Sequence, residues 1–268
     1  MCRRVESIRW ALLSLALLAH PAGASSIFMA MPTPTTGADK VIEYDSQTGQ
    51  VIREFIYPLS PNDWRPTDVA VGPNGYLYVA SQTRQQDDGA EILRIDLSTG
   101  EFSVLATDGI EGISRLVFGP DGHLYASSSK ANAAAKVVRY DAETGAVLGT
   151  FVAGPFPSPS PGGLGFGPNG NLFVGIADSV VEFDGVTGEL IRALATGFVA
   201  PNGIVAGPNG RLVVADTGAG RLFVLDAETG GLRRKIGNGR FVDATFDENG
   251  FLLASVNQSG SPLMRFNW

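Results

Sequence analysis

Two short turn motifs recur along the chain at a nearly constant spacing. The first is Gly-Pro-Asn-Gly or a close variant, and its last residue is Gly75, Gly122, Gly170, Gly210 and Gly250. These glycines are 47, 48, 40 and 40 residues apart. The second is Asp-x-x-Thr-Gly, which begins at Asp45, Asp96, Asp141, Asp184 and Asp226. A period of this length, with short apolar runs between turns, is typical of a β-propeller.

Both motifs have a local physical reason to turn the chain. Asn-Gly between apolar runs favours a tight hairpin, because both residues tolerate positive φ. In Asp-x-x-Thr-Gly the carboxylate can accept nearby backbone N–H groups, and glycine closes the turn. The runs between them are rich in Val, Ile, Leu, Phe and Tyr and sustain no helical period, so we expect strands.

A count of the strands gives the size of the ring. With strands named a to d from the channel outward, b and c each occur six times, but a and d occur five times. The missing inner strand belongs before Ile27 and the missing outer strand after Trp268. We therefore predict an all-β, six-bladed β-propeller of four-stranded antiparallel blades, with the first and last blades incomplete. Either the natural sequence continues past Trp268, or the ring has two three-stranded blades.

The first residues do not follow the repeat. Three arginines precede an apolar run at 10–19, and Ala22-Gly23-Ala24 is an A-x-A cleavage site. This pattern predicts a secretory signal peptide over 1–24, followed by a single propeller domain over 25–268. We expect a secreted or periplasmic bacterial protein that loses its one cysteine, Cys2, and keeps one histidine, His123.

Charge and hydropathy restrict the partners. The whole chain has a net charge of −7, which argues against nucleic acid or an anionic membrane as a partner. No second apolar span follows the leader, so we expect no membrane span in the mature chain. The remaining expectation is a small molecule or a protein.

The loops divide the ring into two faces. The a–b and c–d turns are nearly identical in every repeat, whereas the b–c and d–a connections differ, as in the 82–90, 127–135 and 153–163 segments. Variable loops on a repeated scaffold usually carry specificity. We therefore place function on the b–c/d–a face, where each strand a opens at the mouth of the channel.

Seven residues near this mouth are candidate ligand-binding residues: Trp64, Arg65, Asp68, Arg115, Phe198, Asp216 and Arg240. Aromatic rings with arginines could hold a flat or anionic ligand. The alternative is structural: aromatics fill gaps between blades, arginines pair with Asp63, Asp68 and Asp243, and Asp216 forms a turn. His123 follows an a–b turn on the opposite rim, which argues against catalysis.

The stretch PNGIVAGPNGRLVVADTGAGRLFVLD at 201–226 is close to an NHL repeat unit. On this motif the chain resembles the NHL-repeat and SMP-30/gluconolactonase/LRE-like propellers. That resemblance implies a divalent metal, typically Ca²⁺, held at the mouth by a Glu, Asn residues and an Asp. Asn202 matches the asparagine, whereas Asp243 lies one position beyond the expected Asp, where Val242 stands. The Glu would open the first strand a.

Two classes of function follow. The first is a ligand-binding or protein-interaction module that uses the b–c/d–a face. The second is a calcium-dependent lactonase-type hydrolase with Asn202 and Asp243 as metal ligands and Asp243 as the candidate catalytic residue. Structural alternatives stand beside both residues, because Asn202 could form an Asx turn and Asp243 could bind neighbouring N–H groups. No organic cofactor is implied.

Overall fold

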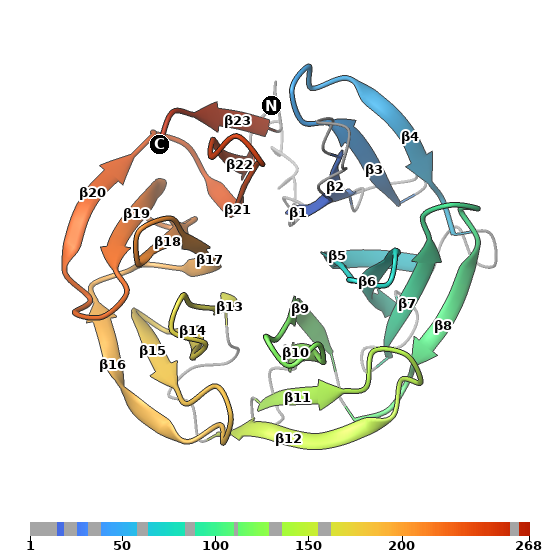
Figure 1. The fold of residues 1–268 in the computed structure, drawn as a ribbon, viewed down its shortest axis with the longest axis horizontal. Coiled ribbons are helices and arrows are strands. Elements are labelled where there is room, and N and C mark those ends of the chain that lie inside the picture. The colour runs from blue at the N-terminus through green and yellow to red at the C-terminus, as the bar shows by residue number, and fades with distance from the viewer. Residues whose placement is uncertain are drawn as a thin grey trace, which may run out of the picture.

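The protein is described by a computed structural model over residues 15–18, 26–31, 39–57, 64–83, 89–109, 112–128, 136–154, 162–257 and 263–268. Most of the predicted leader lies outside these residues, as do large parts of the 82–90, 127–135 and 153–163 connections. Six antiparallel sheets are arranged in a ring around a central axis (Figure 1). The all-β, six-bladed propeller predicted from the repeats is therefore confirmed.

Each sheet takes its strands consecutively from the chain, with the first three sheets covering the N-terminal half. The first sheet contains β1 (Leu15–Leu18), β2 (Ser26–Met31), β3 (Lys40–Asp45) and β4 (Val51–Phe55). The second contains β5 (Trp64–Val71), β6 (Tyr76–Thr83), β7 (Ala90–Asp96) and β8 (Phe102–Ala106). The third contains β9 (Ile113–Phe118), β10 (Leu124–Ser128), β11 (Lys136–Tyr140) and β12 (Val147–Ala153).

The remaining three sheets complete the ring. The fourth contains β13 (Leu164–Phe166), β14 (Leu172–Ile176), β15 (Ser179–Phe183) and β16 (Leu190–Thr196). The fifth contains β17 (Pro201–Gly207), β18 (Arg211–Asp216), β19 (Arg221–Asp226) and β20 (Leu232–Ile236). The sixth contains β21 (Phe241–Phe246), β22 (Leu252–Val256) and β23 (Leu263–Phe266), and it has three strands, as predicted.

The first sheet differs from the count made on residues 25–268. That range supplies three strands to it, β2 to β4, and the inner position is taken by β1, from within the predicted leader. Leu18 pairs with Ser26, and Ala16 lies in the same buried cluster as Phe28 and Ala30. A leader and an inner strand have similar apolar compositions, because both are shielded from water.

The Asp-x-x-Thr-Gly turns form as predicted. Asp141 Oδ1 accepts the backbone N–H groups of Glu143 and Thr144 at 3.1 and 2.8 Å and the Thr144 hydroxyl at 2.8 Å. Gly145 closes the turn at φ +75°. These bonds hold the pKa of Asp141 below its usual value, the Thr144 backbone N–H being the largest cause.

The Gly-Pro-Asn-Gly turns differ from the predicted Asn-Gly hairpin in four of five repeats. Only in the fifth blade do both central residues have positive φ, at Asn209 (60°) and Gly210 (70°). In the other four, among them the turn that ends at Gly75, only the last glycine is in the left-handed region. In these four turns the backbone N–H of the last glycine donates to the carbonyl of the first turn residue, so a single left-handed glycine closes the turn.

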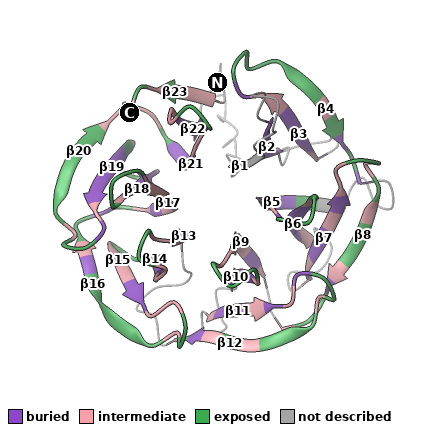
Figure 2. Ribbon diagram, in the orientation of Figure 1, coloured by how far each residue is buried: buried purple, intermediate pink, exposed green. Residues whose placement is uncertain are grey.

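The core lies between the blades. Strands β10, β14 and β22 are buried along their whole length, whereas the outer β20 is exposed at four of five positions (Figure 2). Aromatic rings pack edge to face across neighbouring blades, for example Tyr125 with Phe166 at 5.0 Å between centroids. Every blade therefore depends on its neighbours for burial, which fixes the inner strands around the channel.

Candidate functional site

The inner strands of four blades carry an irregularity at the same place, where each enters the channel. In β5, Pro66 and Asp68 pair with consecutive residues of β6, so Thr67 is an extra residue. The same interruption leaves out Ser114 in β9, Asn202 in β17 and Val242 in β21. Such β-bulges bend a strand and redirect its side chains, and they are frequent next to functional sites.

The residue after each extra residue falls in one repeat position, and three of these residues are charged. They are Asp68, Arg115 and Asp243, which we call the mouth triad. Arg115 Nη1 lies 3.5 Å from Asp68 Oδ1 and 3.3 Å from Asp243 Oδ2, and Arg115 Nη2 donates to the Val242 carbonyl at 3.2 Å. One guanidinium nitrogen is thus shared between two carboxylates.

The triad joins two neighbouring blades to a third across the channel. Asp68 belongs to β5, Arg115 to β9 and Asp243 to β21, and Figure 1 shows β9 and β21 on opposite sides of the ring. The Arg115 side chain therefore reaches across the channel. The three side chains are 4%, 7% and 14% exposed, so their charges interact with little screening by water.

Burial is the main influence on Asp68. It raises the pKa of this carboxyl to about 7, against the opposing attraction of Arg115, and the negative charge of Asp243 raises it further. Asp68 Oδ2 also accepts the Leu116 backbone N–H at 2.5 Å, which ties blade two to blade three. Burial thus favours the neutral form of Asp68, whereas Arg115 favours its charged form.

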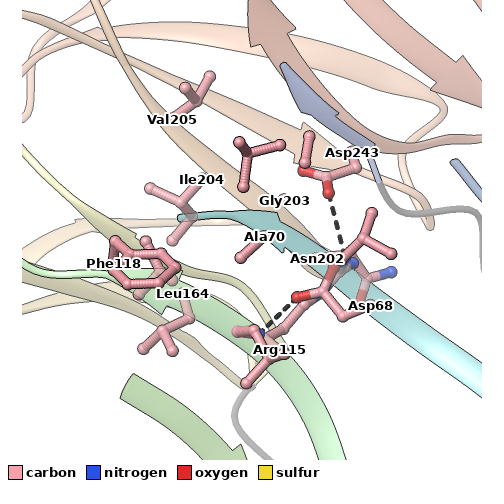
Figure 3. Close-up of a pocket in the computed structure, with 15 residues that line it drawn as sticks. Asp68, Ala70, Arg115, Phe118, Leu164, Asn202, Gly203, Ile204, Val205 and Asp243 are labelled. Atoms are coloured by element: carbon pink, nitrogen blue, oxygen red, sulfur yellow. Dashed lines mark hydrogen bonds and ion pairs between the residues drawn. The ribbon is translucent and has the colours of Figure 1, made fainter. Parts of the chain in front are cut away.

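A cavity of about 260 Å³ lies in the channel beside the triad. In Figure 3, Asp68, Arg115, Asn202 and Asp243 lie on one side of it and Phe118 and Leu164 on the other. Its further lining is mostly apolar and comes from the inner strands: Ala16, Val69, Ala70, Val71, Leu116, Val117, Gly203, Ile204 and Val205. The cavity thus has one polar end and an apolar body.

Asn202 connects this cavity to a second one. Its amide Nδ2 donates to Thr217 Oγ1 at 2.6 Å, and the Thr217 hydroxyl donates to the Phe241 carbonyl at 2.6 Å. Asn202 also lines a cavity of about 350 Å³, together with Gly162, Gly175, Asp178 and others. An added Cβ on Gly162 would lie 2.5 Å from the Pro201 carbonyl oxygen, so glycine is needed for this close approach of blades four and five.

Two predicted ligand-binding residues lie away from the cavities. Asp216 is fully buried, and its carboxylate accepts the backbone N–H groups of Val199 and Ala200, both at 2.8 Å, and of Ala219 at 3.0 Å. Phe198 packs edge to face on Phe223, with ring centroids 5.2 Å apart, in the core between blades four and five. Asp216 and Phe198 therefore have the structural roles that the sequence offered as alternatives to ligand binding: Asp216 holds a turn, and Phe198 fills a gap between blades.

The three other candidates are at the edge of the mouth. Arg65, the second residue of β5, and Arg240, which directly precedes β21, are both exposed. Trp64 begins β5, but its side chain lies outside the described residues, as do Asp63, Ile110 and Phe156. The structure thus brings together Asp68, Arg115, Asn202 and Asp243 of the predicted residues.

His123 lies on the opposite rim, as the repeat position predicted. It lines a cavity of about 460 Å³ between blades three and four with Asp121, Arg139, Asn169 and other residues. Arg139 Nη1 lies 3.7 Å from Asp121 Oδ2, so this arginine already has a carboxylate nearby. The sequence missed this groove, because the turns that form it belong to different repeats.

The fold and the mouth define a six-bladed β-propeller with a polar cluster at one end of its channel. Residues 198–225 match the NHL repeat family, which agrees with the repeat unit identified in blade five. No curated protein matches the sequence.

Solved propellers superpose over most of the chain at low sequence identity. A glucose dehydrogenase gives a TM-score of 0.70 at 14% identity, over 97% of this chain and 98% of that one. A protein in a nidogen/laminin complex gives 0.68 at 13%, over 84% and 79%. A catalytically inactive virginiamycin B lyase from Staphylococcus aureus, with quinupristin, gives 0.64 at 17%, over 95% and 80%. At these identities the likeness shows the fold alone.

Two features of the described residues bear on partners. No helix among them is both long and apolar enough to cross a membrane. They also contain no group of three or more His, Cys, Asp or Glu side chains placed to hold a metal ion.

Proposed function

We propose that the protein is an exported propeller that binds a small molecule at the b–c/d–a mouth of its channel. The observation that supports this most is the mouth triad. Four inner strands bulge at one repeat position, and three of them present charged side chains to a common cavity. A scaffold that needed only packing would fill these positions with apolar residues, because burying charges costs free energy.

The same loop face could instead bind a protein, as the name of the nidogen/laminin complex suggests for that neighbour. We favour a small molecule because the charged groups are buried at the channel entrance rather than spread over the rim. The Asp68 and Arg115 side chains are only 4% and 7% exposed, which leaves little charge for a flat protein surface to contact. Export rests on the leader pattern over 1–24. Cleavage after Ala24 would remove β1 and take Ala16 from the cavity lining, but the polar residues of the mouth all lie on later strands.

The calcium-dependent hydrolase is the alternative, and the residues at the mouth fit it poorly. Ca²⁺ takes six to eight oxygen ligands, and a nearby cation opposes its binding. Here the Arg115 guanidinium lies 3.3 Å from Asp243 Oδ2, and the described residues contain no group of three or more His, Cys, Asp or Glu side chains placed to hold a metal ion. Calcium titration of chelator-stripped protein should therefore produce no heat of binding and no rise in melting temperature.

A thermal-shift screen tests the binding proposal. Amino acids, sugars, sugar lactones, carboxylic acids and nucleosides would each be added at millimolar concentration to the purified protein. A ligand at 100 times its Kd stabilises by about 2.7 kcal/mol, or roughly 5–11 °C for a chain of this size. We expect at least one class to raise the melting temperature, and the shift to be lost in Asp243→Asn.

Asp121→Asn, on the opposite rim, is the matched control. It removes one carboxylate from the cavity of about 460 Å³ that His123 lines, so the ligand should still raise the melting temperature of this variant. The proposal is wrong if no class of ligand shifts the wild-type protein. It is also wrong if the shift survives in Asp243→Asn and is lost in Asp121→Asn, which would move binding to the turn face.

A further inference from the structure

We propose that the channel-mouth site takes a small zwitterion with an apolar side chain, of the α-amino-acid class. This inference rests on the proposed function and specifies the chemistry of its ligand. Four properties of the cavity support it: the order of its charges, the length of its ion pairs, the division of its lining into a polar and an apolar part, and its volume.

The charges alternate in sign across the mouth. Arg115 lies between Asp68 and Asp243, and each carboxylate comes from a different blade. A ligand with a single negative charge would bring a fourth charge beside two carboxylates, and a single positive charge would lie beside the guanidinium. A ligand with both charges can place its carboxylate at Arg115 and its ammonium at a carboxylate. Complementary charges of both signs thus avoid a buried like-charge contact.

The existing ion pairs leave room for better ones. Charge-assisted N–H···O contacts are typically about 2.7–2.9 Å long, whereas Arg115 Nη1 lies 3.3 and 3.5 Å from its two carboxylates. One nitrogen serves both, so neither pair is bidentate. A ligand carboxylate could form a bidentate pair with the guanidinium, and its ammonium could compensate the released Asp243.

The cavity walls select the rest of the ligand. Away from the triad the lining is apolar, with Val71, Phe118, Leu164 and Val205 among the residues that form it. A sugar would leave hydroxyl groups without partners against these side chains, which is costly. An aliphatic or aromatic side chain would gain burial there.

The volume agrees with a small ligand. Sites for drug-sized molecules usually have volumes of about 300–1,000 Å³, and this cavity has about 260 Å³. A single amino acid with a side chain such as that of leucine is a suitable size, whereas a folded peptide or a dinucleotide is too large.

Calorimetric titration of the full chain with L-leucine and its capped analogues tests the inference without any mutation. N-acetyl-leucine lacks the ammonium and leucinamide lacks the carboxylate, and both keep the side chain. We expect leucine to bind, and each capped analogue to bind at least about 30-fold more weakly, because each leaves a buried charge of the triad without its partner. Glucose is the neutral control and should produce no heat of binding.

Two variants locate the binding. Asp243→Asn keeps the shape of the side chain and removes its charge. This variant should therefore bind leucine about as weakly as the wild type binds N-acetyl-leucine. Asp178→Asn, in the neighbouring cavity of the same face, should bind leucine like the wild type. If Asp243→Asn does not fold, the analogue series still decides the question.

The outcomes separate this inference from the proposed function. Equal affinity for leucine and its capped analogues overturns the zwitterion, as does binding that Asp243→Asn leaves unchanged. If leucine fails but a sugar, lactone or nucleoside binds and is lost in Asp243→Asn, the zwitterion is wrong and the mouth remains a ligand site. If no class of ligand binds, both proposals are wrong.

Discussion

The glycine that ends the Asp-x-x-Thr-Gly turn has a role in ring closure that differs between blades. In blade three, a Cβ added to Gly145 would lie 1.9 Å from the Leu105 carbonyl oxygen, on the outer strand of blade two. In blade two, a Cβ on Gly100 would have the Phe55 ring as its nearest neighbour, at 3.9 Å, which is ordinary contact. The two glycines have nearly the same φ, +75° and +79°.

Gly145→Ala and Gly100→Ala therefore form a matched pair. Alanine in the left-handed region costs about 1–2 kcal/mol, and this cost is common to both. Gly145→Ala adds an overlap with backbone that only a separation of two blades can relieve, for which overpacking costs of about 1–3 kcal/mol are typical. We expect Gly145→Ala to melt about 2–12 °C below Gly100→Ala.

Thermal and urea unfolding followed by circular dichroism would measure the difference. The transition should keep its slope with denaturant, since the contact between the blades changes but the buried area hardly does. Equal losses of stability in the two variants would refute the argument, because they would show that the turn conformation alone requires glycine. Gly188→Ala, where the added Cβ would lie 1.9 Å from the Phe151 carbonyl oxygen, should behave like Gly145→Ala.

Three further predictions concern the triad, the interblade arginines and the first strand. Because the folded-state pKa of Asp68 is raised from 3.8 to about 7, the stability that this group contributes is full below pH 3.8 and is lost as the pH rises to 7 and above. Asp68→Asn should therefore remove about 1–4 kcal/mol of pH-dependent stability between pH 4.5 and 8, measured as melting temperature; an unchanged profile would contradict it. Arg192 bonds the buried Glu182 at 2.7 Å, so Arg192→Ala should cost about 1–3 kcal/mol in urea unfolding. The control is Arg233→Ala, which removes an exposed ion pair and should cost much less stability. Equal losses of stability in the two variants would show that the burial of Glu182 is not the cause. A chain that begins at Ser25 lacks β1 and should lose about 2–4 kcal/mol of burial, or roughly 4–16 °C, and an unchanged melting temperature would mean that β1 is dispensable.

The sequence determined the architecture through its turns. Asp141 to Gly145 is a five-residue unit whose bonds are all local, and the same unit in four other repeats set the strand count and the period. Antiparallel strands joined by short turns leave little freedom in topology, so six repeats predicted six blades. The assignment of one loop face to function also followed from the repeats alone.

Only the tertiary structure decided which candidate residues meet. Asp68, Arg115 and Asp243 share a repeat position, but that position does not say that Arg115 reaches across the channel to blade six. The contact depends on ring diameter and on bulges at Thr67 and Val242, which no local pattern in the sequence marks. The same holds for Asp216, whose three N–H partners lie in two loops.

The first inner strand shows a second limit of the sequence, because the same apolar run predicts a leader and forms a strand in the structure. Leucine and alanine in an N-terminal apolar run suit a leader and a buried strand equally well, because both environments exclude water. The position beside β2 is defined by a ring that closes about 240 residues later along the chain, through β21 and its neighbours. Local sequence fixes turns and strand faces, whereas contacts across a closed ring are decided by the geometry of all six blades together.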